Sequence, residues 1–141
     1  MLEERLINDS LIIAPQAMTN SATVTANLDT QGANYATIRV CLASEINTNA
    51  VGPTLSLKHS DDTVVTNFAT VVADQTAVDL TAKREVLYGI DLRGKKRYLR
   101  LSVTTATATN DDVTVAAVAT LSKLEDAPNG TTSVADTVVF G

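Results

Sequence analysis

The chain has 141 residues, of which 45% are hydrophobic and 19% are charged. This length suits a single domain, because two independent cores would each be too small to be stable. The formal net charge of −5 argues against a sequence-independent attraction to the phosphates of nucleic acid or to anionic lipid. We therefore expect one folded domain with no nucleic acid partner.

The start of the chain and its hydropathy predict a protein that is made in the cytoplasm and does not associate with membranes. The first five residues are acidic where a secretory signal would be basic. No apolar run approaches the roughly 20 residues that are needed to span a bilayer. The single cysteine, Cys41, cannot form an internal disulfide, so stability must come from packing and from any oligomerisation.

The types of residue favour β-structure. Val and Thr recur throughout the chain, Trp is absent and aromatic residues reach only 4%. β-Branched side chains suit a pleated strand better than a helix. Strand-like runs of apolar and β-branched residues alternate with turn clusters. The sequence therefore predicts an all-β fold: an antiparallel β-sandwich, jelly-roll-like, with seven or eight strands and extended termini.

Alternation of apolar and polar residues predicts the strands of the first half of the chain. They are residues 10–13, 22–28, 35–44, 54–59 and 64–72. The first two are interpreted as edge strands or arms. In the third, Ile38, Val40 and Leu42 share one face. Ser60, Asp61 and Asp62 predict a turn that joins the last two strands as a hairpin.

The second half of the chain continues the pattern. The expected strands are residues 77–80, 85–92, 97–105 and 113–121. The basic turn Arg93-Gly94-Lys95-Lys96 predicts a hairpin between 85–92 and 97–105, and Asn110-Asp111-Asp112 predicts a further turn. We expect residues 1–21 to form an N-terminal arm or edge strand, 22–123 the β-sandwich domain and 124–141 a C-terminal tail.

The C-terminal tail is rich in turn formers and ends in the apolar residues Val138, Val139 and Phe140. Such a segment is more often a frayed terminus or a last strand on its own domain than an arm that reaches a neighbour. Both interpretations stay open.

Candidate catalytic residues are few. His59, the only histidine, lies beside Ser60 and Asp61, which are the residue types of a hydrolytic triad. Neighbours along one strand point in alternate directions, however, so these three cannot meet as a triad requires. Cys41 has no histidine partner in the sequence and is interpreted as a packed thiol. We expect no catalytic residues.

The sequence also predicts no metal and no cofactor. The acidic pairs Asp61-Asp62 and Asp111-Asp112 lack the spacing of a calcium loop and are interpreted as turn carboxylates. No glycine-rich phosphate loop occurs in the sequence. With so few aromatic residues a stacking platform for sugars is hard to build, so sugar recognition is a weak alternative.

A large interface on this chain would depend on area, backbone pairing and chain ends. Arg93, Lys95, Lys96, Arg97 and Arg100 form the densest positive charge in an acidic chain, which is either a docking patch for an acidic protein surface or a solvated turn. The candidate protein-interface residues are Leu6, Ile7, Leu11, Ile12, Ile13, Arg93, Lys95, Lys96, Val138, Val139 and Phe140.

Three segments resemble small proteins that tailed bacteriophages encode next to the major capsid protein. They are residues 29–38, residues 55–62 with their Ser-Asp-Asp turn, and residues 88–103 with Gly94-Lys95-Lys96-Arg97-Tyr98-Leu99-Arg100. The resemblance implies a jelly-roll-like or related sandwich that decorates the phage head, and it implies no active site.

On this basis we expect a structural virion protein on the outer surface of the capsid, made in the host bacterial cytoplasm and without enzymatic activity. Its partners would be the major capsid protein and itself, as a homotrimer or else a dimer. Its termini would reach across joints between capsid subunits, so that removing residues 1–14 would weaken binding and leave the fold intact. The alternative is a tail or fibre component that binds a receptor. A polysaccharide hydrolase would need paired carboxylates across a cleft, and the sequence shows none at convincing positions.

Overall fold

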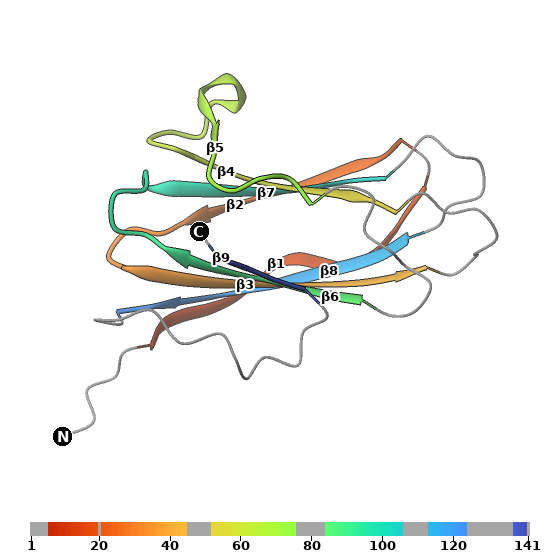
Figure 1. Ribbon diagram of the computed structural model, residues 1–141, viewed down its shortest axis with the longest axis horizontal. Helices are drawn as coiled ribbons and strands as arrows, with labels where there is room; N and C mark the ends of the chain where they lie inside the picture. The colour runs from red at the N-terminus through yellow and green to blue at the C-terminus, as the bar shows by residue number, and fades with distance from the viewer. Residues whose placement is uncertain are drawn as a thin grey trace.

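The computed structural model describes residues 6–19, 21–44, 52–75, 84–105, 113–123 and 137–140. Within these ranges the chain forms nine strands and one short 3-10 helix (Figure 1). The strands are β1 (Leu6–Met18), β2 (Thr23–Asp29), β3 (Tyr35–Ser44), β4 (Thr54–Ser60), β5 (Ala69–Thr70), β6 (Arg84–Asp91), β7 (Tyr98–Thr104), β8 (Val113–Ser122) and β9 (Thr137–Phe140), and the 3-10 helix is η1 (Val65–Asn67). No helix in the described part of the chain has the length and hydropathy that a bilayer span requires.

The strands form two facing sheets. The five-stranded sheet has the order β1-β8-β3-β6-β9, and the four-stranded sheet has the order β2-β7-β4-β5. The first eight strands pair as β1 with β8, β2 with β7, β3 with β6 and β4 with β5, all antiparallel. This is the pairing of a long hairpin wound into two sheets, which is the jelly roll. The predicted all-β sandwich is confirmed, and β9 adds a parallel strand beside β6.

The core lies between the two sheets and consists mainly of aliphatic side chains. In β3, Ile38, Val40 and Leu42 are buried, as their alternation predicts, and the same holds for the inward residues of β7 and β8. Removing such side chains from water contributes about 1.5–3 kcal/mol each. Two of the aromatic rings, those of Tyr35 and Tyr88, are also buried.

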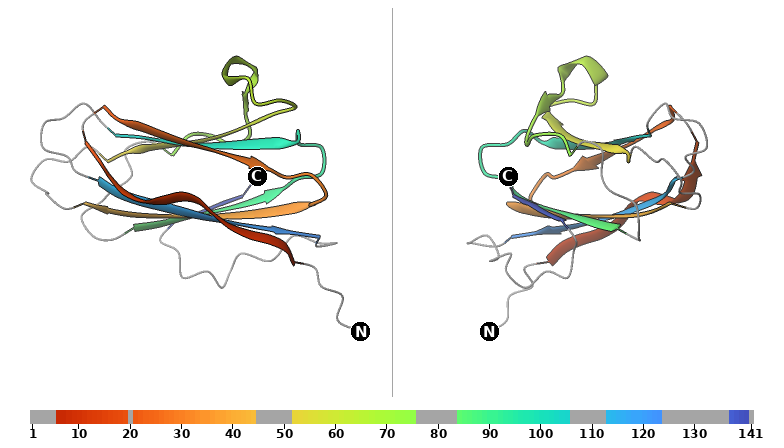
Figure 2. Two further views of the ribbon diagram at one scale, coloured as in Figure 1. Left: turned by 180° about the vertical axis from the view of Figure 1, so that it is seen from behind. Right: turned by 45° about the vertical axis from the view of Figure 1, so that its right-hand side comes forward.

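The N-terminal segment is an edge strand of the five-stranded sheet. Figure 2, which turns the molecule to its back, shows β1 running along the near edge of that sheet. The strand is longer than predicted and continues through Pro15, where the register with β8 shifts between Ile13 and Gln16. Edge strands and bulges are where a proline without an N–H is tolerated. Because Ile13 belongs to the core, deleting residues 1–14 is not expected to leave the fold intact.

The predicted hairpin between 54–59 and 64–72 is confirmed in its antiparallel pairing, but the extent of its second strand is wrong. Residues Val65–Asn67 form the 3-10 helix, and within 64–72 only the two residues of β5 form a strand, which pairs with β4. The reason is local: the Asp62 carboxylate accepts hydrogen bonds from the backbone N–H of Val64 at 2.9 Å and from the Asn67 side chain at 2.9 Å. These bonds favour a compact turn over an extended strand. The segment projects above the four-stranded sheet in Figure 1.

The predicted hairpin between 85–92 and 97–105 is also wrong. β6 lies in the five-stranded sheet and β7 in the four-stranded sheet, so the basic turn crosses from one layer to the other (Figure 1). Alternating apolar residues show that each strand buries one face, but two strands that face each other across a core have the same pattern as hydrogen-bonded neighbours. The expected strand at 77–80 and turn at 110–112 lie outside the described residues.

Candidate functional site

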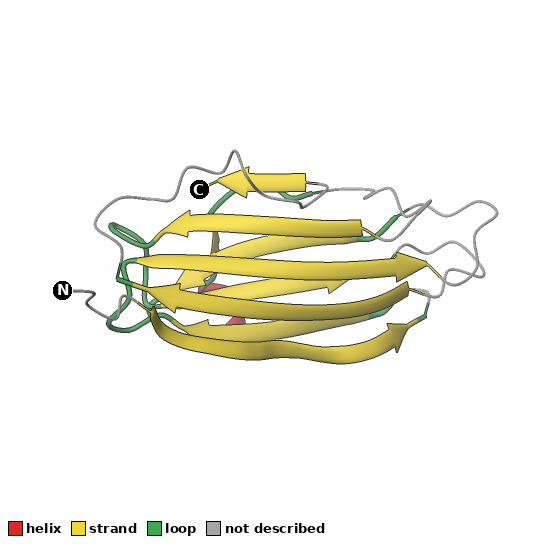
Figure 3. Ribbon diagram, turned by 90° about the horizontal axis from the view of Figure 1, so that it is seen from below, coloured by secondary structure: helices red, strands yellow, loops and turns green. Residues whose placement is uncertain are grey.

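Two large exposed hydrophobic side chains lie next to each other on the five-stranded sheet. Leu11 of β1 is 58% exposed and Val118 of β8 is 41% exposed. The two residues are register partners on neighbouring strands, and such partners have Cβ atoms about 4.5–5.5 Å apart. Both side chains therefore lie together on the outer face of this sheet, the side from which Figure 3 views the molecule.

The row that begins with this pair continues across the sheet. Val118 is the partner of Arg39 in β3, and Arg39 is the partner of Leu87 in β6, which is half-buried. The Arg39 guanidinium forms a salt bridge of 2.8 Å with Glu85. We refer to Leu11, Val118, Arg39 and Leu87 as the outer row. It spans four strands and is apolar at both ends, with a paired cation between them.

The outer row is bordered by polar contacts and by the edge of the sheet. On one side, the Thr120 hydroxyl bonds to the Asp9 carboxylate at 2.5 Å, which links β8 to β1. Among the described strands, β1 pairs only with β8, so its other edge presents backbone groups without a strand partner. An edge of this kind is a template on which another chain can pair. The apolar pair and a strand edge thus lie on the same side of the molecule.

The structure separates the predicted interface residues of the N-terminal segment. Leu6 and Ile7 lie in β1, but their side chains are outside the described set. Leu11 is exposed and Ile12 packs partly against the core. Ile13 is only 2% exposed, so its side chain is not accessible to a partner, and its inclusion was wrong. The register shift between Leu11 and Ile13 is the physical reason, because a bulge reverses the alternation of faces.

The basic turn is largely neutralised by carboxylates. Arg93 contacts Asp91 with an Nη2–Oδ2 distance of 2.6 Å, and its hydrogen bonds lower the pKa of Asp91 to about 2. Lys96 Nζ lies 3.3 Å from Asp61 Oδ2. Lys95 is half-exposed, and its backbone N–H closes the turn on the carbonyl of Leu92. This pairing favours the solvated-turn interpretation over a free basic docking patch.

The C-terminal residues lie on the domain itself. Val138, Val139 and Phe140 belong to β9, which pairs with β6 so that Val138 is opposite Leu87. Of the two interpretations left open for the tail, the backbone of these residues agrees with a last strand on its own sheet. Their side chains are outside the described set.

The residues considered for catalysis have structural partners. His59 Nδ1 accepts a hydrogen bond from the Lys96 backbone N–H at 3.1 Å, and burial followed by the charges of the nearby lysines lowers its pKa. The Ser60 hydroxyl bonds to Asp62 within the turn, at 3.3 Å. Cys41 was interpreted as a packed thiol, and this is wrong, because its residue is exposed on the outward phase of β3, between the buried Val40 and Leu42. Partial desolvation raises the pKa of its thiol, with a further contribution from Glu85. Among the described residues, no group of three or more side chains is arranged to hold a metal ion.

No protein-family model and no curated protein sequence matches this chain.

Val118 and Leu87 were not among the predicted interface residues. A signal for Val118 is present in the sequence, because it is the one large apolar residue in the outward phase of the strand, whose other members are small or polar. No comparable signal places it beside Leu11, since their pairing joins opposite ends of the chain.

Proposed function

We propose that this protein is a structural, non-catalytic virion protein that decorates the outer surface of a tailed-phage capsid. It stabilises the shell by bridging neighbouring major capsid protein subunits. The observation that carries the proposal is the exposed, in-register pair of Leu11 and Val118 on the outer row. The resemblance of residues 29–38, 55–62 and 88–103 to phage head proteins supports the choice of partner.

Apolar side chains that adjoin one another on a surface support a binding role. A single exposed aliphatic residue is ordinary, but neighbouring ones that form a continuous patch mark a contact surface. A rigid sheet can present such a patch to a partner without reorganisation, which limits the entropic cost of association. The strand edge of β1 beside the pair adds backbone hydrogen-bonding groups to the same surface.

The proposed mechanism is thermodynamic. A ligand that binds the assembled shell, and not its separate subunits, lowers the free energy of the shell by mass action. At a free concentration of about 100 times Kd the stabilisation is about 2.7 kcal/mol per site. A copy that bridges two capsid subunits must lose one of its contacts before the joint between them can open. Bridging therefore stabilises the joint against opening.

We also propose that copies associate with each other, as a trimer or alternatively a dimer. The symmetry depends on which surface joins the copies. Pairing of two β1 edges would produce a twofold dimer, whereas contact between two different surfaces can close into a ring of three. Light scattering on the purified protein distinguishes these states by mass.

The test measures binding to heads of the parent phage that lack this protein. Wild-type protein should sediment with the heads and raise the temperature at which they open. Leu11→Thr and Val118→Thr both place a β-branched side chain suited to strands, and we expect both to weaken binding. Val64→Thr is the matched control, because Val64 is 54% exposed but lies outside the outer row. Failure of the wild type to bind, or equal binding by all three variants, would overturn the proposal.

A further inference from the structure

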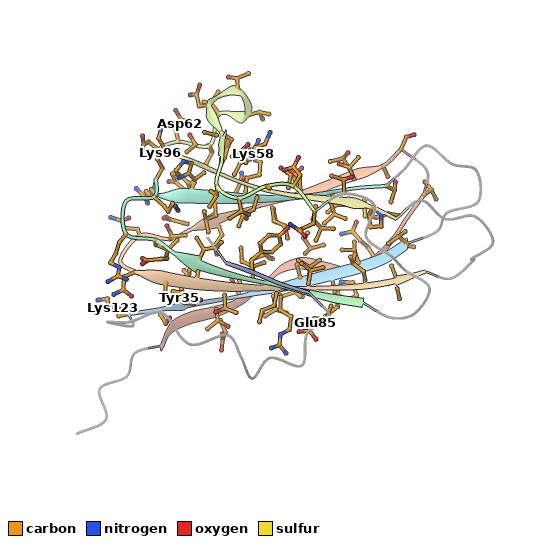
Figure 4. The ribbon with its side chains drawn as sticks, viewed as in Figure 1. Tyr35, Lys58, Asp62, Glu85, Lys96 and Lys123 are labelled. Atoms are coloured by element: carbon orange, nitrogen blue, oxygen red, sulfur yellow. The ribbon has the colours of Figure 1, made fainter. Side chains whose placement is uncertain are left out.

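A pocket of about 300 Å³ lies on the opposite side of the molecule from the outer row. It is formed by the outer face of the four-stranded sheet and by the segment that carries the 3-10 helix. Strands β2, β4 and β7 supply its floor, and Val65 and Phe68 supply a wall. Figure 4 labels Lys58 at this site, between the sheet and the projecting segment. Its volume is at the lower end of the range of small-molecule pockets.

Arg100 is the buried charge of this pocket. Only 9% of it is exposed, and its partners are neutral. Its Nε donates to Asn27 Oδ1 at 2.8 Å, its Nη2 donates weakly to the Thr63 carbonyl at 3.4 Å, and its guanidinium lies 4.1 Å from the ring centroid of Phe68. Among the described residues, none of these partners of Arg100 is a carboxylate. A buried cation without a counter-ion is costly, and an anion supplied from outside would offset that cost.

Lys58 adds a second positive charge. It is the direct cross-strand partner of Arg100 and also lines the pocket. Like charges directly opposite each other destabilise a sheet. The contrast with the basic turn is informative, because Arg93 and Arg97 are each paired with an aspartate there. In the pocket the lining residues include two cations and no acid.

The rest of the floor is lined with hydroxyl groups. Thr25 and Ser102 are register partners, and Thr23 lies farther along the same face of β2. Hydroxyls both donate and accept hydrogen bonds, so they suit a ligand that carries hydroxyls of its own.

Arg100 uses its Nε N–H and one Nη2 N–H in the contacts with Asn27 and Thr63. A guanidinium has further N–H donors, arranged in a planar fork that matches a carboxylate.

We propose that this pocket binds a hydroxylated carboxylate the size of a monosaccharide, of the hexuronic acid class. The carboxylate lies between Lys58 and Arg100, and the ligand hydroxyls face Thr23, Thr25 and Ser102. Recognition depends on charge and hydrogen bonds and needs no aromatic stacking platform. The inference does not rest on the proposed capsid function, because the pocket and the outer row lie on different sheets.

The test is titration of the purified full chain with glucuronate by calorimetry and by amide shifts in NMR spectra. We expect saturable binding of glucuronate that weakens with salt, with amide shifts around Ser102. Glucose, which lacks the carboxylate, and inorganic phosphate, which lacks the ring hydroxyls, should each bind at least about tenfold more weakly. Absence of saturable glucuronate binding, or equal affinity for glucose or for phosphate, would overturn the proposal.

Variants test the assignment of the two cations. Lys58→Gln should weaken glucuronate binding by about tenfold. Lys123→Gln, which removes the same charge from the exposed residue that follows β8, should bind as the wild type does. Arg100→Gln should abolish binding. Since Arg100 also contacts Thr63 and Phe68, Lys58→Gln carries the test if Arg100→Gln does not fold. Unchanged affinity in Lys58→Gln would remove the site from this pocket.

Discussion

Leu11 and Val118 are partners across β1 and β8, and both side chains face solvent on the outer side of the five-stranded sheet. One comes from near the start of the chain and the other from its last long strand, so only the jelly-roll pairing brings them together. Adjacent aliphatic groups exposed in this way gain free energy when a partner covers them. The proposed capsid contact is built on this pair.

The outer row should contribute to binding and not to folding. Val118→Thr keeps the shape of the side chain and its strand preference, and the side chain is exposed. We therefore expect the free energy of unfolding to change by less than about 0.5 kcal/mol while binding to heads weakens. Urea denaturation and sedimentation measure the two quantities on the same preparation. A large loss of stability would show that Val118 supports the sheet itself.

Tyr88→Phe should stabilise the protein. The Tyr88 ring is fully buried, and its hydroxyl has no hydrogen-bond partner among the described residues. Burial also raises its pKa far above the usual range. Removing a buried unpaired hydroxyl should raise the free energy of unfolding by about 1 kcal/mol, as measured by urea denaturation. A decrease instead would mean that the hydroxyl is hydrogen-bonded.

Stability should depend on pH through His59, the only histidine. Burial, followed by the charges of Lys95 and Lys96, lowers the pKa of His59 in the folded chain below its usual value of about 6.5. The unfolded chain therefore takes up the proton first. The contribution of neutral His59 to the free energy of unfolding is fully present above about pH 6.5. It is lost as the pH falls from there through the pKa of His59 in the folded chain.

His59→Gln should lose this dependence between about pH 7 and pH 5. Asp29, Asp62 and Asp91 do not interfere in that window, because the pKa of each is lowered from an already acidic value. Urea denaturation at several pH values gives the comparison. Parallel curves for the wild type and the variant would show that another group titrates.

Gly94 has a backbone conformation that other residues rarely adopt, with φ of +80° in the turn between the two sheets. A Cβ built there meets no atom within 4 Å, so the effect of a substitution comes from the backbone alone. Gly94→Ala should lower the free energy of unfolding by about 1 kcal/mol, and Gly94→Asn by less, because Asn tolerates this region better. Equal stability of the three proteins would contradict the assigned conformation.

Most of the fold could be predicted from the sequence because alternation reports which face of a strand is buried. It placed Ile38, Val40 and Leu42 in the core, where the structure has them. It could not report which strands pair, so β6 and β7 were predicted as a hairpin although they lie in different sheets. Nor could it predict the bulge that turns Ile13 inward, since that depends on the register with β8.

The candidate sites were less accessible to prediction for the same reason. Arg100 was grouped with the basic turn because it is near it in sequence, but its partners are Asn27 and Thr63, and its cross-strand neighbour is Lys58. Arg100 and these neighbours come from three separate segments of the chain. Their proximity follows from the winding of the jelly roll, which no local pattern specifies.

The most direct test of the central claim is cryo-electron microscopy of purified phage heads with the protein present and absent. We predict ordered copies that bridge neighbouring capsid subunits, with the outer row of Leu11, Val118, Arg39 and Leu87 turned toward the shell. An unchanged shell without such density, or bound copies whose outer row faces solvent, would contradict the proposed function.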